Sequence, residues 1–447
     1  MPGTRTTGGE EMLQTVAAIL RERGVEGWLV GGTVRDRELG RYSPDVDVAV
    51  AGQAASVAAD VAQALGAPWF ALSERHGAFR VVVGRAHVDV ATVRGEGILA
   101  DLALRDFTVN AMAVPLEGGG LIDPFGGLHD LRAGRLVAVS EHIFDDDPLR
   151  LMRAPRFAHV LGLRLDPLLT DAVRSQAPRL WRAAPERIAT EMVLTLAAGA
   201  AGDAARLWND LRLLGVVVPE VEEGGYLTPT YAVLDRLEQM LADLPGRFPA
   251  AAPLLEQRLV EPVDGAVDRR VALRLAGLVG GLSPTQALWA GRRLKVSSAL
   301  LALLQTAARM SGPAGRLPGV DGPPPATANT AGPGPSARPV GPGREAVLFF
   351  WAAAPWEPEV ILLAAAAVPA GTSVEAAESL MTLWAKRATS GVPRLPFDGV
   401  GLMKELGLSP GPRLGKALRA AQLAWEAGEA TTAEQALAAA EEALDEG

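Results

Sequence analysis

Two aspartates stand one residue apart in the apolar stretch DVDVAVA, at positions 45 and 47. Side chains alternate along a β-strand, so Asp45 and Asp47 share one face, with Cα atoms about 6–7 Å apart, while Val46 and Val48 point to the other. Carboxylates at this spacing can hold one or two Mg²⁺ ions, which activate a hydroxyl group and bind a polyphosphate. The alternative is a pair of solvated charges on an exposed edge strand.

The residues that precede this pair could hold a triphosphate. In VGGTVRD, Gly31 and Gly32 allow backbone N–H groups to approach a ligand, and Arg35 offers a charged fork for phosphate oxygens. A Gly-Gly pair alone is usually only a turn. Followed in this order by the two aspartates, it predicts a nucleotide site beside a metal site.

A third carboxylate lies in the stretch AHVDVAT. Asp89 alternates with Val88 and Val90 on another predicted strand, so its side chain lies on the face opposite the two valines. If this strand neighbours the first one, Asp45, Asp47 and Asp89 come together as metal ligands. The alternative is a charge that keeps an edge strand solvated.

A small sheet must position these residues, and the first part of the chain provides the pattern for one. From Val16 to about Val139, helical and strand patterns alternate, and after about Ser140 helical periodicity dominates. Residues 312–344 are mostly Pro, Gly, Ala and small polar residues, which cannot bury enough apolar surface to offset the ordering entropy. We expect a linker or long insertion there, and helices again from Glu345.

Composition limits the class of protein. A chain of 447 residues is too long for one core and suggests two to four domains. It has no cysteine, so disulfides and thiolate metal sites are excluded. No segment approaches the ~18 apolar residues of a membrane helix, and the first residues lack the apolar core of a signal peptide, so we expect a cytoplasmic protein without membrane partners. The net charge of −9 does not indicate nucleic-acid binding, although a local basic strip can still hold RNA.

Five motifs in order resemble those of the class II tRNA nucleotidyltransferase and bacterial poly(A) polymerase family. The first is GGTVRDRELGRYSPDVDV, and a segment near the C-terminus, LPFDGVGLMKELGLSPGPRLGKALR, also resembles the family's tail. The other four motifs are RDFTVNAMA (105–113), DPFGG (123–127), DDPLRLMRAPRFA (146–158) and PERIATEM (185–192).

The resemblance implies an α+β fold: a polymerase-beta-like nucleotidyltransferase head, with a mixed sheet and helices, followed by an all-helical neck, body and tail. It implies template-independent, Mg²⁺-dependent addition of nucleotides from CTP, and in some members ATP, to a tRNA 3′ end. The partners would be the acceptor stem and elbow of tRNA, with no DNA and no membrane. The corresponding domains are a head (1–139), a neck with base-selecting and RNA-binding helices (140–200), a degenerate phosphohydrolase-like body (201–311), the linker (312–344) and a tRNA-binding tail (345–447).

Carried onto this chain, the family pattern assigns roles to particular residues. Asp45, Asp47 and Asp89 would be the catalytic metal ligands. Asp147 and Arg150 would select the base, because ionised aspartate only accepts and arginine only donates hydrogen bonds; three residues apart on one helix, they would face the same way. The alternative is a surface ion pair. The triphosphate and ribose would contact Gly31, Gly32, Arg35, Arg105, Asp106 and Asn110, and Arg153 and Arg156 would contact the nucleotide or RNA phosphates, with Arg413 and Lys416 at the tRNA elbow.

Four features depart from the family pattern. Leu104 replaces the first arginine of the usual Arg-Arg-Asp, Asp146 replaces a glutamate, and Gly401 replaces a tail aspartate. Most telling, only the ten residues 95–104, GEGILADLAL, separate DVATVR from RDFTVNA. Members that add the terminal A have a longer flexible loop there, so the short loop favours a CC-adding enzyme over a CCA-adding one.

Other activities fit less well. A poly(A) polymerase would carry basic extensions, a non-catalytic RNA-binding relative would have lost Asp45 or Asp47, and an enzyme acting on a small molecule would not need the tail segment. Some members also carry a His-Asp phosphohydrolase domain. All five histidines here precede residue 160, so we expect no phosphatase or phosphodiesterase activity and interpret the histidines as structural or surface residues.

Overall fold

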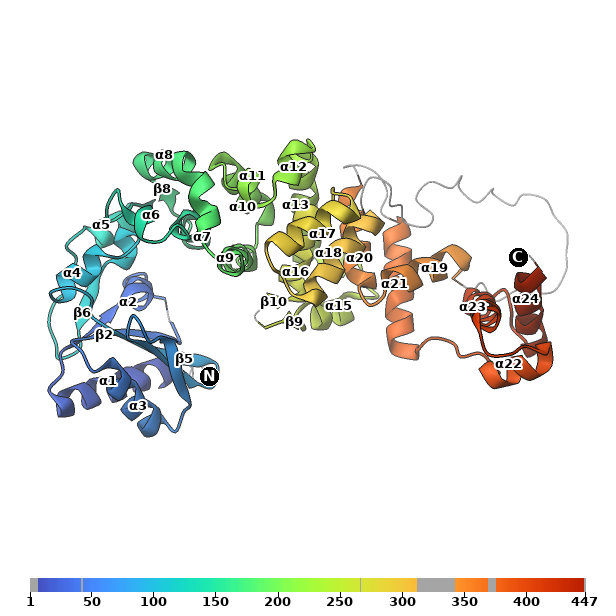
Figure 1. The fold of residues 1–447 in the computed structure, drawn as a ribbon, viewed down its shortest axis with the longest axis horizontal. Helices are drawn as coiled ribbons and strands as arrows, with labels where there is room; N and C mark the ends of the chain where they lie inside the picture. Colours follow the sequence, from blue (N-terminus) through green and yellow to red (C-terminus); the bar gives the residue numbers. More distant parts are fainter. Residues whose placement is uncertain (1–6, 42, 266, 312–341, 369–374, 446–447) are drawn as a thin grey trace. The chain divides into compact units, whose positions relative to one another are not determined.

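The computed structural model describes residues 7–41, 43–265, 267–311, 342–368 and 375–445. The chain forms two compact units: residues 1–195 with 210–216, and residues 196–209 with 217–447 (Figure 1). Most of the predicted linker, 312–341, lies outside the described residues, and the division into head, neck, body, linker and tail stays a prediction.

The first unit is built on a six-stranded mixed sheet with the strand order β3-β4-β5-β2-β1-β6. Strands β2 and β5 are parallel, and every other neighbouring pair is antiparallel. The expected mixed sheet is confirmed. The strands are β1 (Gly27–Val30), β2 (Val46–Val50), β3 (Trp69–Ser73), β4 (Ala78–Val83), β5 (Ala86–Thr92) and β6 (Ala113–Pro115).

The two faces of this sheet carry different residues. Val46 and Val48 of β2 pair in register with Val88 and Val90 of β5, and all four are buried beneath helices α1 (Thr7–Arg23) and α3 (Ala54–Leu65) (Figure 1). The opposite face carries the residues that alternate with these valines. Burial of one face fixes the register, because a slip by one residue would put the carboxylates into the core.

The segment expected to be a short loop, 95–104, contains a helix, α4 (Ile98–Ala103). Its Leu102 is fully buried and, with Ile98, packs against Val30 and Ala49 of the sheet. The loop prediction was therefore wrong in conformation, because two apolar side chains at helical spacing anchor the segment to the head.

Asp147 and Arg150 were expected on one helix, and this is also wrong. Helix α6 (Ile143–Asp146) ends at Asp146, and α7 (Arg150–Leu161) begins at Arg150. Asp147 has the extended backbone angles φ −148° and ψ 104°. The reason is Pro148, whose ring disfavours the helical conformation of the residue before it.

The rest of the first unit is mostly helical. Two of its short strands pair in parallel, and both contact α7. Its further elements are α2 (Gly31–Glu38), η1 (Thr108–Asn110), α5 (Gly127–Arg132), β7 (Arg135–Leu136), β8 (Arg164–Leu165), α8 (Pro167–Gln176), η2 (Ala177–Arg182), α9 (Pro185–Ala197), which ends past the boundary, and α11 (Leu214–Val217).

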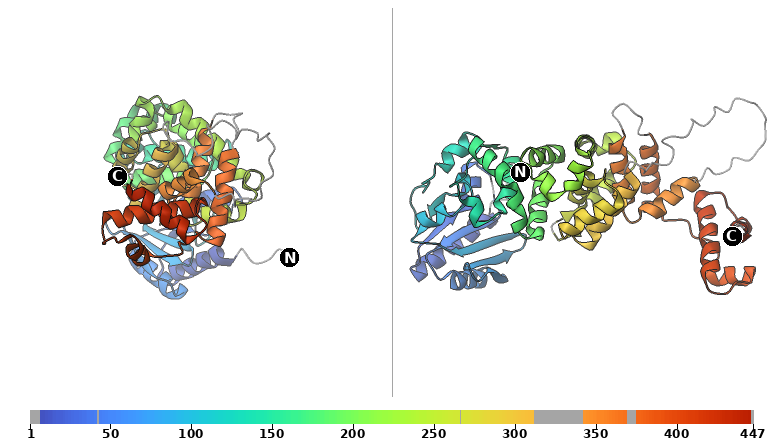
Figure 2. Two further views of the ribbon diagram at one scale, coloured as in Figure 1. Left: turned by 90° about the vertical axis from the view of Figure 1, so that its right-hand side faces the viewer. Right: turned by 45° about the horizontal axis from the view of Figure 1, so that its top comes forward.

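In the part of the second unit that the structure describes, the chain is helical (Figure 2) apart from one short antiparallel pair of strands. Helices α13, α16, α18 and α20 pack together, and α23 packs against α24. Its elements are α10 (Ala201–Asp210), α12 (Pro219–Glu223), α13 (Leu227–Ala242), α14 (Leu244–Arg247), α15 (Ala252–Leu259), β9 (Pro262–Asp264), β10 (Val267–Asp268), α16 (Arg269–Val279), α17 (Pro284–Arg293), α18 (Ser298–Ser311), α19 (Arg344–Ala353), α20 (Glu357–Ala367), α21 (Glu375–Ser390), α22 (Gly399–Leu406), α23 (Pro412–Ala427) and α24 (Ala433–Asp445).

None of the described helices is by itself long and apolar enough to cross a membrane. Helices α19 and α20 reach that length and composition only when they are counted together, across a bend of 108°.

Candidate active site

A cavity of about 1160 Å³ opens in the first unit, on the sheet face opposite α1 and α3. It collects residues that lie far apart in the sequence, from the sheet, from α2 and from the helices after it. Of the predicted site residues, it is lined by Gly31, Gly32, Arg35, Asp47, Asp89, Arg105, Asp106, Asn110, Asp147, Arg150 and Arg153.

Two of the three predicted metal ligands face each other across neighbouring strands. Asp47 of β2 and Asp89 of β5 are register partners, and β5 lies inside the sheet, which excludes the edge-strand alternative for Asp89. Burial and then the charge of Asp89 raise the pKa of Asp47, against the opposing effects of Arg105, His87 and Thr33. Ionisation of Asp47 is therefore unfavourable in free energy when no metal is bound. A divalent cation beside the two carboxylates would offset this unfavourable free energy. The chemistry of the site fits a metal.

Asp45 does not line the cavity. Its Oδ1 atom accepts a hydrogen bond from the backbone N–H of His87 at 3.1 Å, and lies 2.9 Å from Nδ1 of the same imidazole. Within the described part of the chain, no three acidic or histidine side chains are grouped to hold a metal. The role of Asp45 as a ligand stays a prediction that requires its side chain to turn away from His87.

His87 and Arg80 were missed as neighbours of the carboxylates. Arg80 of β4 makes two hydrogen bonds of 2.7 Å to the two oxygens of Asp89, and His87 Nε2 lies 3.7 Å from Asp89. A signal was present in FRVVVGRAHVDV: a two-residue turn at Gly84 and Arg85 pairs position 80 with position 89. The interpretation of the histidines as structural or surface residues did not include this contact between His87 and the carboxylates.

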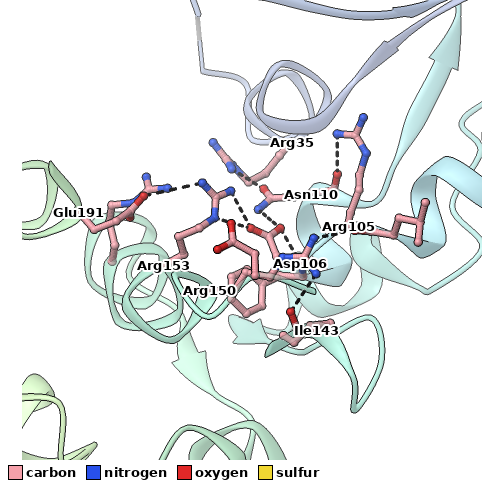
Figure 3. A network of polar contacts seen from close by, with 12 residues as sticks. Arg35, Arg105, Asp106, Asn110, Ile143, Arg150, Arg153 and Glu191 are labelled. Atoms are coloured by element: carbon pink, nitrogen blue, oxygen red, sulfur yellow. Dashed lines mark hydrogen bonds and ion pairs between the residues drawn. The ribbon is translucent and has the colours of Figure 1, made fainter. Parts of the chain in front are cut away.

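A chain of polar contacts crosses the cavity from α2 to α9 (Figure 3). Arg35 donates to Oδ1 of Asn110 at 2.6 Å, and the Asn110 amide donates to Asp106 at 3.1 Å. The other oxygen of Asp106 accepts from Arg153 at 2.8 and 2.7 Å, and Arg153 lies 3.8 Å from Glu191. These contacts hold two guanidinium groups in place at one cavity, which suits a ligand with several phosphates.

Asp106 carries the central charge of this network. Burial alone would raise its pKa, but Arg153, Asn110 and the backbone N–H of Phe107 outweigh burial and lower it. Asp106 is therefore an ionised, buried partner that fixes Arg153.

Asp101, on α4, holds two further arginines. It accepts from the Arg94 side chain at 2.9 Å and from Arg105 at 3.1 Å, and its own side chain is 5% exposed. Arg105 in turn reaches the carbonyl of Asn110 at 3.5 Å. The short segment 95–104 thus fixes the position of a predicted triphosphate ligand.

Gly31 starts α2 directly behind β1, with a positive φ of 64°. A Cβ atom there would lie 2.9 Å from the guanidinium of Arg105 and 3.7 Å from Asp47. At Gly32 a Cβ atom would lie 3.4 Å from Arg35. A side chain at Gly31 would displace the arginine that faces the cavity, which explains the glycine.

Asp147 and Arg150 both line the cavity, but each has protein partners. Arg150 donates to the carbonyl oxygen of Ile143 at 3.1 Å (Figure 3). It also donates to the carbonyl oxygen of Leu104 at 2.7 Å, and Asp147 pairs with Arg187 at 2.8 Å. Leu104, the departure from Arg-Arg-Asp, lines the same cavity and is 39% exposed. The end of the segment 95–104 is therefore bonded directly to a predicted base-selecting residue.

The remaining predicted RNA contacts lie outside the cavity lining. Arg156 is bonded to Glu191 and stands 4.1 Å above the ring of Phe157. Arg413 and Lys416 belong to the second unit, where they are exposed at the start of α23.

Comparisons with known proteins identify the family of the chain. Residues 27–137 match the family described as "Poly A polymerase head domain", and residues 162–224 match "Probable RNA and SrmB- binding site of polymerase A". A CC-adding tRNA nucleotidyltransferase of Geobacter sulfurreducens is 33% identical over 308 residues, which cover 67% of this chain and 70% of that protein. The chain belongs to the class II tRNA nucleotidyltransferase family. Its members are nucleotidyltransferases that generally depend on a divalent metal.

Relatives of this nucleotidyltransferase differ in what they add. An A-adding tRNA nucleotidyltransferase of Deinococcus radiodurans is 39% identical over 205 residues, which cover 45% of this chain and 46% of that protein. A Thermotoga maritima CCA-adding enzyme complexed with tRNA has a TM-score of 0.65 and 22% identity, covering 98% of this chain and 95% of that one, and shows the shared fold.

Replacing Asp106 with asparagine is expected to destabilise the nucleotidyltransferase by about 2 kcal/mol, because the half-buried guanidinium of Arg153 would lose its buried carboxylate partner. The folded-state pKa of Asp106 is lowered, so its stabilisation is complete above the ordinary aspartate pKa of about 3.9 and is lost as the pH falls through the folded-state value. Urea unfolding at pH 3 to 7 is expected to show a gap between wild type and D106N that is constant above pH 5 and shrinks below about pH 4. D171N, at a carboxylate that is 78% exposed, is the control and should follow wild type.

Proposed function

We propose that this chain is a tRNA 3′-end nucleotidyltransferase that adds two cytidines from CTP and then stops. The observation that carries the proposal is the register pair Asp47 and Asp89 at the floor of a cavity walled by Arg35, Arg105 and Arg153. Acidic residues at the floor and basic residues in the walls fit a hydroxyl group, a metal ion and a triphosphate in one place.

The reaction joins the RNA 3′-oxygen to the α-phosphorus of CTP. The bond from that phosphorus to the bridging oxygen of the β-phosphate breaks, pyrophosphate leaves, and the 3′-hydroxyl proton is lost to solvent. Mg²⁺ bound by Asp47 and Asp89, and by Asp45 once it turns from His87, would lower the pKa of the hydroxyl and offset charge on the leaving group. Arg35 and Arg105 bind the triphosphate, and Asp106 and Asn110 keep Arg35 and Arg153 in place.

The restriction to cytidine follows from the segment 95–104. The segment contains one short helix, α4, which packs on the sheet through Leu102, and the carbonyl of Leu104, directly after that helix, accepts a hydrogen bond from Arg150. A base-selecting arginine that is bonded to a packed segment keeps one position relative to the base. Accepting A after C would require that arginine to take a second position. By name, one of the two relatives adds CC and the other adds A. The argument for adding cytidine alone therefore depends on the segment 95–104.

The other partners follow from the same proposal. Arg413 and Lys416, exposed at the start of α23, are proposed contacts to phosphates of the tRNA elbow. A cytoplasmic location supplies both CTP and tRNA. A poly(A) polymerase remains the nearest alternative activity.

The test uses the purified protein, Mg²⁺ and tRNA transcripts that end at the discriminator base, at C or at CC. With CTP and ATP together, we expect growth from the first two transcripts to stop at CC and the third to remain unchanged. One added A on the CC transcript would make this a CCA-adding enzyme and overturn the argument from 95–104. A ladder of A residues would indicate a poly(A) polymerase, and no addition to any transcript would refute the catalytic assignment.

A further inference from the structure

Strand β3, at the edge of the sheet, exposes three large apolar side chains. Trp69 is 41% exposed, Phe70 51% and Leu72 47%. Exposed edge strands are usually protected by charged residues or proline, because an apolar edge invites aggregation. The exposed apolar residues of β3 therefore indicate a surface that binds another molecule.

The register of the sheet places Phe70 in line with the carboxylates. Phe70 pairs with Arg80, Arg80 with Asp89, and Asp89 with Asp47, so the four residues form one row across four strands. Directly paired residues share a face of the sheet, so Phe70 lies on the cavity face. Neighbouring strands are about 4.8 Å apart, which puts Phe70 about 10 Å from Asp89.

A second row on the same face leaves room for a ligand. Ala78 pairs with Ala91 and Ala91 with Ala49, all three line the cavity, and Leu72 of β3 lines it beside them. Small side chains along this row keep the space above it open, so the cavity continues from Asp47 and Asp89 to β3.

The two faces of β3 differ. Trp69 points to the α3 face, where its ring lies 5.8 Å from that of Phe79. Phe70, on the cavity face, has no aromatic partner among the described residues. A half-exposed ring beside a phosphate-binding cavity is the feature with which proteins bind single-stranded nucleic acids, because any base can stack on it.

We propose that β3 is the platform for the unpaired 3′ end of the RNA substrate, with a base stacked on Phe70 while the terminal hydroxyl lies at Asp47 and Asp89. The distance of about 10 Å between Phe70 and Asp89 accommodates two to three nucleotides at 3.4 Å each. This inference rests on the proposed function and adds a contact to the acceptor. On a tRNA that ends at the first C, the stacked base is the unpaired discriminator.

The experiment measures KM and kcat for CTP addition to two transcripts ending at the first C, one with an intact and one with an abasic discriminator. On the intact transcript, Phe70→Ala is expected to raise KM for tRNA about tenfold, the loss of one base–aromatic stack, with KM for CTP unchanged. Phe70→Trp should stay within about twofold of wild type, because it keeps a ring. On the abasic transcript, wild type and Phe70→Ala should differ by less than about twofold, since the stack is already lost.

Trp69→Ala is the matched control, because it removes an exposed ring from the opposite face of the same strand. A tenfold effect of Trp69→Ala, an equal loss for Phe70→Ala on both transcripts, or wild-type behaviour of Phe70→Ala would each overturn the platform. These outcomes differ from failure of the proposed function, in which the wild-type protein adds no cytidine to any transcript.

Discussion

Replacing Asp47 with asparagine is expected to abolish cytidine addition and, at the same time, to raise the thermal stability of the protein without metal. Activity should fall by at least roughly a thousandfold, because a metal ligand is worth several kcal/mol in the transition state. Stability should rise because burial and the charge of Asp89 make an ionised Asp47 unfavourable, as its raised pKa indicates. Each 1 kcal/mol relieved corresponds to about 2–4 °C in Tm for a domain of this size.

The pH dependence gives the sign of this effect. The unfolded chain ionises Asp47 near the ordinary pKa of about 3.9, whereas the folded protein does so at higher pH, so ionisation favours the unfolded chain as the pH rises between the two values. The stability advantage of D47N should therefore grow from pH 4 upward and vanish in more acid solution. Added Mg²⁺ should raise the Tm of wild type and leave that of D47N unchanged.

Asp60→Asn is the control for this prediction, since Asp60 forms an exposed ion pair with Arg23 and has a lowered pKa. It should keep full activity and gain no stability. Retained activity in D47N would remove Asp47 from the catalytic site, and an unchanged or lower Tm would show that its burial carries no cost.

Replacing Arg150 with lysine is expected to lower the rate of addition from CTP by about ten- to a hundredfold and to narrow the preference for CTP over UTP. A guanidinium presents two parallel donors to a base edge, and a good bidentate contact of this kind is worth about 1–3 kcal/mol of discrimination. Lysine keeps the charge but offers no planar fork. The measurement is kcat/KM for each nucleotide on a transcript that ends at C.

The ratio of the two nucleotides separates base selection from a structural effect. Arg150 also bonds the carbonyl groups of Leu104 and Ile143, so a looser helix junction would lower the rates with CTP and UTP equally. Arg164→Lys, at an exposed position outside the cavity, should match wild type in both rates. An unchanged ratio in R150K would exclude Arg150 from base recognition.

The kind of reaction could be predicted from the sequence, because it depends on residue types and on their spacing over a few positions. Because Asp47 and Asp89 alternate with buried valines, both side chains must lie on the face opposite the valines. This holds whichever strands pair with theirs in the sheet. The order of glycines, arginine and aspartates in the first motif predicted the family, which the comparisons confirm. A small domain with a sheet, followed by a mostly helical remainder, could be predicted from the change of periodicity near Ser140, and the mixed sheet was implied by the family resemblance.

Only the tertiary structure decided which partners each charge meets, because those contacts join distant parts of the chain. Asn110 binds Arg35 from 75 residues away, and Arg153 meets Asp106 from 47 residues away. Neither spacing carries a local signal. The same holds for the bond from Arg150 to Leu104, which ties the segment 95–104 to the cavity.

One local prediction was wrong because a neighbour overrode the pattern, and the role of Asp45 as a metal ligand stays a prediction. The family resemblance led us to expect a short loop at residues 95–104, yet burial of Ile98 and Leu102 against the sheet accompanies a helix, α4, within this segment. Asp45 shares its sequence pattern with Asp47, but the backbone and ring of His87 on the adjacent strand draw its carboxylate out of the cavity lining. Sequence by itself determined which groups could react; packing between strands and helices decided which of them share one site, because a side chain's position depends on contacts that only the folded chain creates.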